Sequence, residues 1–261
     1  MGKPGIVPRS SCSLVNTETW VKGLAKENDH LLKENLASLR VLGEKQNVTL
    51  LLREVISDPA LLSSIASRSY THINHFDKII LIDAPSHNYR LTLHVWWPIN
   101  QNKQLDDEPM HDHRFDFWST ILTGKLKSYY FSQASSGKQY QKFEYIPEEE
   151  NTSSIMRYIG ESKLKETRCT ELRVGDCYYL PYSVIHKILL LKDQVTSTLV
   201  LRGPQLKRSA YIYKSCHTPI DYELDRPVMG ADELKVKLTA LCDILVQERQ
   251  VDRRQVVLQH G

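Results

Sequence analysis

The feature that most constrains the fold is a succession of short β-rich segments between Phe76 and Tyr213. Each segment is rich in β-branched and aromatic residues, and Gly, Pro or Asn residues lie between them. The predicted strands cover residues 78–83, 89–97, 118–122, 125–131, 142–146, 154–159, 169–173, 177–180, 185–191, 197–201 and 210–213. Short strands at this spacing predict an all-β core, either an antiparallel sandwich or a barrel.

Helical periodicity flanks this β-rich region on both sides. Apolar residues recur at helical spacing from Trp20 to Leu42, again over residues 48–56, and from Asp58-Pro59 to Tyr70. After Pro219 the same period returns. The predicted organisation is a flexible tail (1–15), a helical N-terminal extension (16–72), a β barrel (73–217), and a C-terminal helix and tail (218–261).

Three histidines form the main candidate site. His111 and His113 are separated by one residue, and side chains at positions i and i+2 of a strand leave the same face. His186 follows 73 residues later. Neutral imidazoles are common ligands of Fe, Zn, Cu and Ni, so the three predict a metal centre. The alternative is that they are ordinary surface or core histidines.

The surroundings of these histidines resemble the two motifs of the cupin superfamily. In the first motif His111, His113 and Gly124 have the expected spacing, and Phe117 stands where most members have a metal-binding Glu. The second motif is matched by Gly175, Pro181 and His186, with departures at Ser183 and Leu190; the Gly that opens the first motif is replaced by Leu105. The resemblance implies an antiparallel double-stranded β-helix, a jelly-roll barrel, with one metal ion bound by His111, His113 and His186.

Within this superfamily, a ligand set of three histidines without Glu is similar to that of cysteine dioxygenase and other thiol dioxygenases. Residues 110–113 and 123–127 are similar to segments of those enzymes. The segment 197–204 resembles the strand that carries their outer-shell tyrosine, with Arg202 near the place of that tyrosine. The resemblance implies Fe(II) as cofactor, and we expect no coordination by Glu108, Asp112 or Asp116.

Candidate substrate-binding residues lie on the strand over residues 89–97. Arg90, Thr92, His94 and Trp96 share one face, which must meet either solvent or the barrel cavity. If it meets the cavity, Arg90 is the first candidate to bind a substrate carboxylate as a bidentate pair. Arg202 is the second candidate, and a solvent-exposed strand arginine is the alternative for both.

Aromatic residues complete the candidate set. Phe117 and Trp118 near the metal would lower the local polarity, unless they are simply core residues of the barrel. Close to the third histidine lie Tyr178, Tyr179 and Tyr182. The hydroxyl of any one of them is a candidate group beside bound oxygen, with Tyr179 and Tyr182 as the catalytic candidates and packing as the alternative.

Composition excludes several other classes. A formal net charge of +3 over 261 residues is too small for a nucleic-acid-binding surface, and there is no run of eighteen apolar residues for a membrane span. The five cysteines are scattered without a C-x-x-C pair, and the first residues lack the apolar core of a signal peptide. A cytoplasmic protein is therefore expected.

We therefore expect a mononuclear Fe(II) oxygenase that uses O₂ on a small molecule, such as an amino acid or a thiol carboxylate. Two alternatives stay open: a lyase, isomerase or hydrolase that uses Zn, Ni or Mn without O₂, and a non-catalytic cupin that binds a small molecule. The expected partners are a small-molecule substrate and O₂, with neither nucleic acid nor membrane, and a homodimer is compatible with the sequence.

Overall fold

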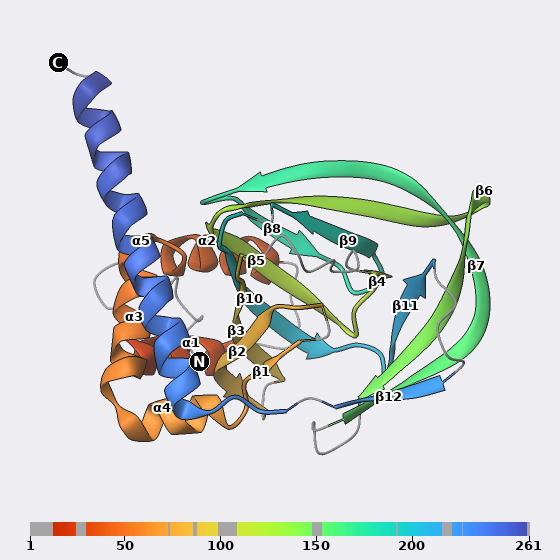
Figure 1. The fold of residues 1–261 in the computed structure, drawn as a ribbon, viewed down its shortest axis with the longest axis horizontal. Coiled ribbons are helices and arrows are strands. Elements are labelled where there is room, and N and C mark those ends of the chain that lie inside the picture. The colour runs from red at the N-terminus through yellow and green to blue at the C-terminus, as the bar shows by residue number, and fades with distance from the viewer. Residues whose placement is uncertain are drawn as a thin grey trace.

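A computed structural model describes residues 13–24, 30–72, 74–85, 88–98, 109–147, 153–191, 193–215, 221–225 and 227–259. Within these residues, two six-stranded antiparallel sheets face each other, and a layer of helices covers one of them (Figure 1). The predicted all-β core with helical extensions is confirmed. Most of the predicted tail (1–15) lies outside the described residues.

The first sheet has the order β1-β2-β3-β10-β5-β8. Its strands are β1 (Tyr70–Thr71), β2 (Asp77–Ala84), β3 (Tyr89–Trp96), β5 (Phe115–Thr123), β8 (Cys177–Leu180) and β10 (Thr196–Gln205). The second sheet has the order β11-β4-β9-β6-β7-β12. Its strands are β4 (Met110–His111), β6 (Lys125–Pro147), β7 (Ser153–Arg173), β9 (Ile185–Leu190), β11 (Ala210–Lys214) and β12 (Asp221–Asp225).

The strand order identifies the barrel. Eight consecutive strands, β3 to β10, divide between the sheets as β3-β10-β5-β8 and β4-β9-β6-β7. This arrangement is the two nested Greek keys of a jelly roll, which is the cupin-type double-stranded β-helix predicted from the histidine motifs.

Sequence patterns placed most strands but misjudged their continuity. The segments predicted as 125–131 and 142–146 belong to the single strand β6, and those predicted as 154–159 and 169–173 belong to β7. Both strands curve around the barrel, as Figure 1 shows. The short strands β1, β4 and β12 were not predicted, and β12 lies where only the closing helix was expected.

The N-terminal helices are α1 (Leu14–Gly23), α2 (His30–Leu42), α3 (Lys45–Ser57) and α4 (Pro59–Ala66), and α5 (Ala231–Gln259) follows the barrel. The Asp58 side chain caps α4 by accepting from the N–H groups of Ala60 and Leu61, with Pro59 at the first helical position. Gly43 follows α2, where a Cβ atom would come within 2.6 Å of the Thr120 side chain on β5. The turn before α3 therefore approaches the sheet closely.

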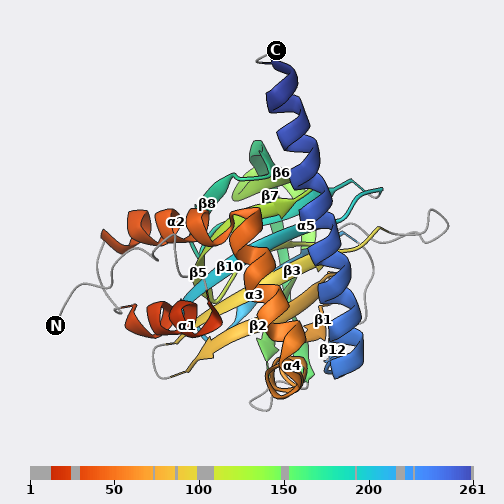
Figure 2. The same cartoon turned by 90° about the vertical axis from the view of Figure 1, so that its left-hand side faces the viewer.

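The helices lie against the outer face of the first sheet (Figure 2). On β3, Leu91, Leu93 and Val95 point to this side and join a buried core with residues of α1 to α5. Arg90 and His94, in alternate positions, point to the other side and line a cavity between the sheets. The polar face of β3 therefore meets the barrel cavity, not solvent. None of the described helices combines the length and apolarity that a membrane span requires.

Candidate metal centre

The three predicted histidines come together at the cavity between the two sheets. His111 on β4 lies opposite His186 on β9 in the register of the second sheet. The candidate ligand nitrogens of His111, His113 and His186 all lie within 4.8 Å of one another. One metal ion can contact all three, as predicted.

The position of His113 does not result from strand alternation, as the spacing of the two histidines had suggested. β4 ends at His111, so the two histidines do not share a regular strand face. Instead, the backbone N–H of Asp112 donates to the carbonyl of Tyr211 at 3.0 Å, and the N–H of His113 donates to the carbonyl of Tyr182 at 3.1 Å. These contacts turn the chain so that both imidazoles still point at one spot.

The ring nitrogens have the spacing that one metal ion requires, and the His111 ring also has the tautomer that it requires. Nε2 of His113 and Nε2 of His186 are 2.8 Å apart, close to the separation of about 3 Å between two ligands whose bonds to one ion are about 2.1 Å long. His111 Nδ1 lies 2.9 Å from the Pro109 carbonyl oxygen, which only accepts, so Nδ1 carries the proton and Nε2 keeps its lone pair.

Burial keeps these imidazoles neutral. It lowers the pKa of His111 and lowers the pKa values of His113 and His186 well below the ordinary value of 6.5. The neighbouring imidazoles lower the pKa of His113 further. Because a metal ligand must be unprotonated, this environment favours metal binding at neutral pH.

Phe117, which stands at the Glu position of the cupin motif that the sequence resembles, lies beside His113. Its ring meets the His113 ring nearly at a right angle, with centroids 4.9 Å apart, and it lines the cavity. The nearby acidic groups have other partners. Asp112 forms an ion pair with Lys207 at 2.6 Å and accepts a hydrogen bond from the Tyr211 N–H. Glu108 lies outside the described residues.

The second nearby carboxylate, Asp116, holds the loop that precedes β9. It accepts from the Tyr179 hydroxyl at 2.6 Å and from the Tyr182 backbone N–H at 2.7 Å. The described part of the chain therefore presents three imidazoles and no carboxylate to the candidate metal position.

Three residues predicted for the site do not line the cavity, namely Trp118, Tyr179 and Tyr182. Trp118 and Tyr179 are register partners across β5 and β8, and their rings pack together 5.3 Å apart against the helical side of the sheet. Tyr182 supplies backbone contacts but does not line the cavity. Tyr178, one position before Tyr179, points inward and lines it. Strand alternation between Tyr178 and Tyr179 is the signal that separates the two.

His94 lines the cavity, which is one of the two environments that the strand pattern left open for its face of β3. Its Nε2 is 3.2 Å from the Thr92 hydroxyl oxygen, and its ring lies 4.5 Å from that of Phe76. Burial, with a smaller contribution from Lys78, lowers the pKa of His94 well below 6.5. His94 is therefore a neutral polar group in an aromatic part of the cavity wall.

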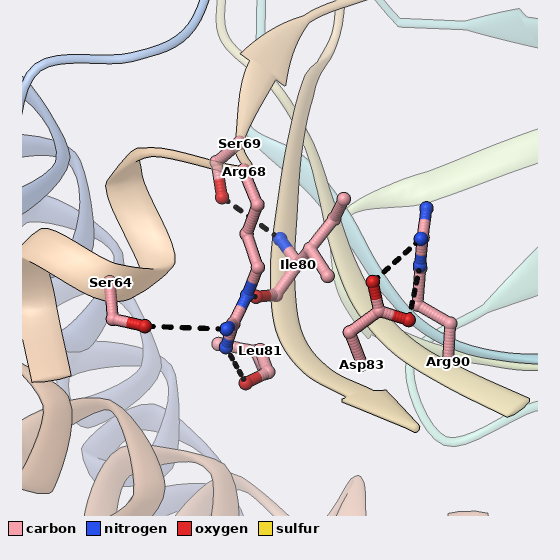
Figure 3. Close-up of polar contacts among 7 residues, drawn as sticks. All are labelled: Ser64, Arg68, Ser69, Ile80, Leu81, Asp83 and Arg90. Atoms are coloured by element: carbon pink, nitrogen blue, oxygen red, sulfur yellow. Dashed lines mark hydrogen bonds and ion pairs between the residues drawn. The ribbon is translucent and has the colours of Figure 1, made fainter. Parts of the chain in front are cut away.

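Both candidate arginines line the cavity, but their surroundings differ. Arg90 donates to Asp83 through Nε at 3.1 Å and through Nη2 at 2.7 Å (Figure 3). The Nε of Arg202 is buried and has no hydrogen-bond partner within the described ranges. Its guanidinium carbon lies 4.9 Å from the Phe115 ring centroid. Arg90, the first candidate for a substrate carboxylate, thus already has a carboxylate partner, whereas the Nε of Arg202, the second candidate, has none within the described ranges.

Two residues of the site were missed by sequence reasoning. Lys207 contacts Asp112 across 95 positions of sequence, and nothing in its local pattern signals that contact. Asp83 was placed at the end of a strand without a role. Its inward direction depends on a bulge in β2, which simple alternation cannot reveal.

No protein-family model and no curated protein sequence matches this chain. Among solved structures, it is similar to an RmlC-like cupin family protein from Methanocaldococcus jannaschii with a double-stranded β-helix fold. That match has 11% identity and a TM-score of 0.28, and covers 50% of this chain and 80% of the other.

Two further similar structures are enzymes. One is hydroquinone 1,2-dioxygenase from Sphingomonas sp. TTNP3, with 11% identity and a TM-score of 0.31; the match covers 49% of this chain and 65% of that one. The other is hydroxypropylphosphonic acid epoxidase from S. wedmorenis, with 12% identity and a TM-score of 0.31, covering 52% and 53%. This chain thus spans less than two thirds of either enzyme chain.

Proposed function

We propose that this protein is a mononuclear non-haem iron oxygenase of the cupin type, which uses O₂ to oxidise a small molecule that carries an acidic group. The observation that carries the proposal is the set of three neutral imidazoles, with Phe117 in the usual place of a carboxylate, at the wall of a cavity of about 500 Å³. Ferrous iron bound by His111, His113 and His186 would keep its full charge and supply open positions at which substrate and O₂ meet.

The residues around the histidines serve this chemistry in separate ways. Arg202 is suited to bind the acidic group of the substrate, because a partly buried guanidinium whose Nε lacks a hydrogen-bond partner gains most from an anionic partner. Phe117 excludes water from one side of the metal position. The pair of Asp112 and Lys207 anchors the segment between the two first histidines to β11.

The cavity also informs the size and character of the substrate. Its volume of about 500 Å³ falls within the range of roughly 300–1,000 Å³ typical of sites for drug-sized ligands. His72, Phe76, His94 and Trp96 form one aromatic part of its wall. We therefore extend the expected substrate from a simple amino acid to an acid with a sizeable apolar or planar part. If the oxidised group is a thiol, both atoms of O₂ are added to sulfur, and a sulfinic acid is formed.

The test combines metal analysis with oxygen uptake on the purified protein. About one iron per chain, lost in His186→Ala and retained in the exposed-histidine control His75→Asn, together with O₂ consumption that depends on an added acid, supports the proposal. Turnover without O₂ consumption on Zn, Ni or Mn would favour a lyase, isomerase or hydrolase. Stoichiometric small-molecule binding without metal would favour a non-catalytic cupin.

A further inference from the structure

Four cavity-lining side chains form a continuous row across the first sheet. Asp83 on β2 is the register partner of Arg90 on β3, and Arg90 is the partner of Arg202 on β10. On its other side, Arg202 is the partner of Phe117 on β5, which contacts His113. Since directly opposed residues have Cβ atoms about 5 Å apart, the row leads from a carboxylate, through two guanidinium groups, to the candidate metal centre.

A β-bulge determines that Asp83 belongs to this row. Lys78 pairs with His94 and Ile80 with Thr92, but Ile82 then pairs with Leu91, so Leu81 is the extra residue. Without it, regular alternation would turn Asp83 to the face opposite that of Lys78. With it, both Lys78 and Asp83 line the cavity.

The helical layer holds the bulge in place. Arg68, which follows α4, donates from Nε to the Ile80 carbonyl and from Nη2 to the Leu81 carbonyl, each at 2.8 Å (Figure 3). The neighbouring Ser69 hydroxyl accepts from the Ile80 N–H at 3.0 Å. These contacts replace the strand neighbour that β1 is too short to provide, because β1 pairs only with Asp77 and Lys78.

The charges of the row do not cancel. Asp83 neutralises Arg90 through a two-point contact, and the side chains of the pair are 27% and 18% exposed. Arg202 stays a cation at neutral pH, although burial and, after it, the charge of Arg90 lower its pKa to about 10. Arg202 is partly buried, its Nε has no hydrogen-bond partner within the described ranges, and it lies opposite another arginine. Such a guanidinium is costly without an anion beside it, so it points to a ligand.

We propose that Asp83 is a specificity residue that sets the charge of the acidic group accepted by this cavity. Because Asp83 already compensates Arg90, the row offers one net positive charge, at Arg202. At the Arg202 position of this row, a monoanion, such as a carboxylate, is therefore preferred to a dianion, such as a phosphate monoester. This inference rests on the acidic substrate of the proposed function, but it needs neither iron nor O₂ to be correct.

The experiment measures equilibrium binding of two aromatic anions to the purified full-length protein, with its metal content recorded. The probes are phenylacetate, with one negative charge, and phenyl phosphate, which has two at pH 7.5 because the second pKa of a phosphate monoester is about 6. Calorimetric titration is applied to the wild type, Asp83→Asn, Arg202→Met and the control Asp243→Asn, which removes an exposed carboxylate from α5.

The wild type and Asp243→Asn are expected to bind phenylacetate more tightly than phenyl phosphate. Asp83→Asn frees Arg90, so the ratio of the two dissociation constants should shift by about tenfold or more toward phenyl phosphate, equivalent to about 1.4 kcal/mol. Arg202→Met should weaken phenylacetate binding at least about tenfold. These shifts are independent of catalysis, so they stand even if oxygen uptake is never observed.

An unchanged preference in Asp83→Asn, or unaltered phenylacetate binding in Arg202→Met, overturns the inference. The inference is also overturned if the wild type binds neither phenylacetate nor phenyl phosphate at about 10 mM. Circular dichroism confirms that each variant is folded, and Asp83→Ser replaces Asp83→Asn if the latter is not. Failure of metal binding with the charge preference intact would count against the proposed oxygenase alone.

Discussion

The ring of Phe117 stands at 82° to the imidazole of His113, with the ring centroids 4.9 Å apart. This edge contact puts an apolar side chain beside the candidate metal position, where the cupin motif usually has a carboxylate. A metal ion bound there would be surrounded by neutral ligands and a low-polarity wall, so it would attract anionic groups from the cavity.

The contact leads to a prediction about Phe117→Glu. The new carboxylate would lie beside the three histidines and add a charged ligand, so the metal should bind about tenfold or more tightly than in the neutral variant Phe117→Gln. Competition with a chromophoric chelator measures both affinities. Equal affinity in the two variants would show that position 117 does not face the ion.

Removal of His113 should abolish stoichiometric metal binding. Its Nε2 lies 2.8 Å from that of His186, so His113→Ala leaves two of the three neutral ligands. We expect metal affinity to fall by about 100-fold or more, whereas His75→Asn should bind metal as the wild type does. Metal content after dialysis is the measurement, and full occupancy of His113→Ala would contradict the assigned ligand set.

The anchoring pair of Asp112 and Lys207 should contribute to both stability and metal affinity. Lys207→Met leaves the Asp112 carboxylate, with a side chain 7% exposed, without its cation. Desolvation already raises the pKa of Asp112, and Lys207 opposes that effect. Breaking a largely buried pair on one side costs about 3 kcal/mol or more.

Urea unfolding and metal titration measure these two losses, and Lys235→Met, on the exposed face of α5, is the matched control. If Lys207→Met is as stable as the control, the pair of Asp112 and Lys207 does not stabilise the segment that carries His111 and His113.

The buried imidazole of His94 should make the folded protein sensitive to acid. Its pKa in the folded state is well below 6.5, so below about pH 6.5 the unfolded chain binds more protons than the folded one, and stability falls as the pH falls. His94→Gln removes this contribution. Between pH 6.5 and 5.5 the wild type should lose up to about 1 kcal/mol more than the variant.

Denaturant unfolding at several pH values gives the comparison. Parallel pH profiles for the wild type and His94→Gln would mean that His94 is accessible to protons in the folded state.

The sequence by itself determined the fold class and the metal-binding candidates. Alternating apolar residues and turn residues identified most strands, and the spacing of His111, His113 and His186 within two motifs indicated a cupin barrel. Alternation also showed that Arg90 and His94 share one face of β3, although it left open whether that face meets the cavity or solvent. Strand positions and side-chain faces depend on residues close together in the sequence. Local patterns therefore reveal them, because strand geometry repeats every two residues.

The tertiary structure alone decided which charged groups meet. A single bulge reverses the direction of Asp83, and the contacts that support this bulge come from Arg68, two positions after the end of α4. Likewise, the pairing of Lys207 with Asp112 joins segments far apart in the sequence. Such pairs depend on register shifts and on the packing of distant elements, so the pairing of Arg90 with Asp83 could be recognised only in the folded chain.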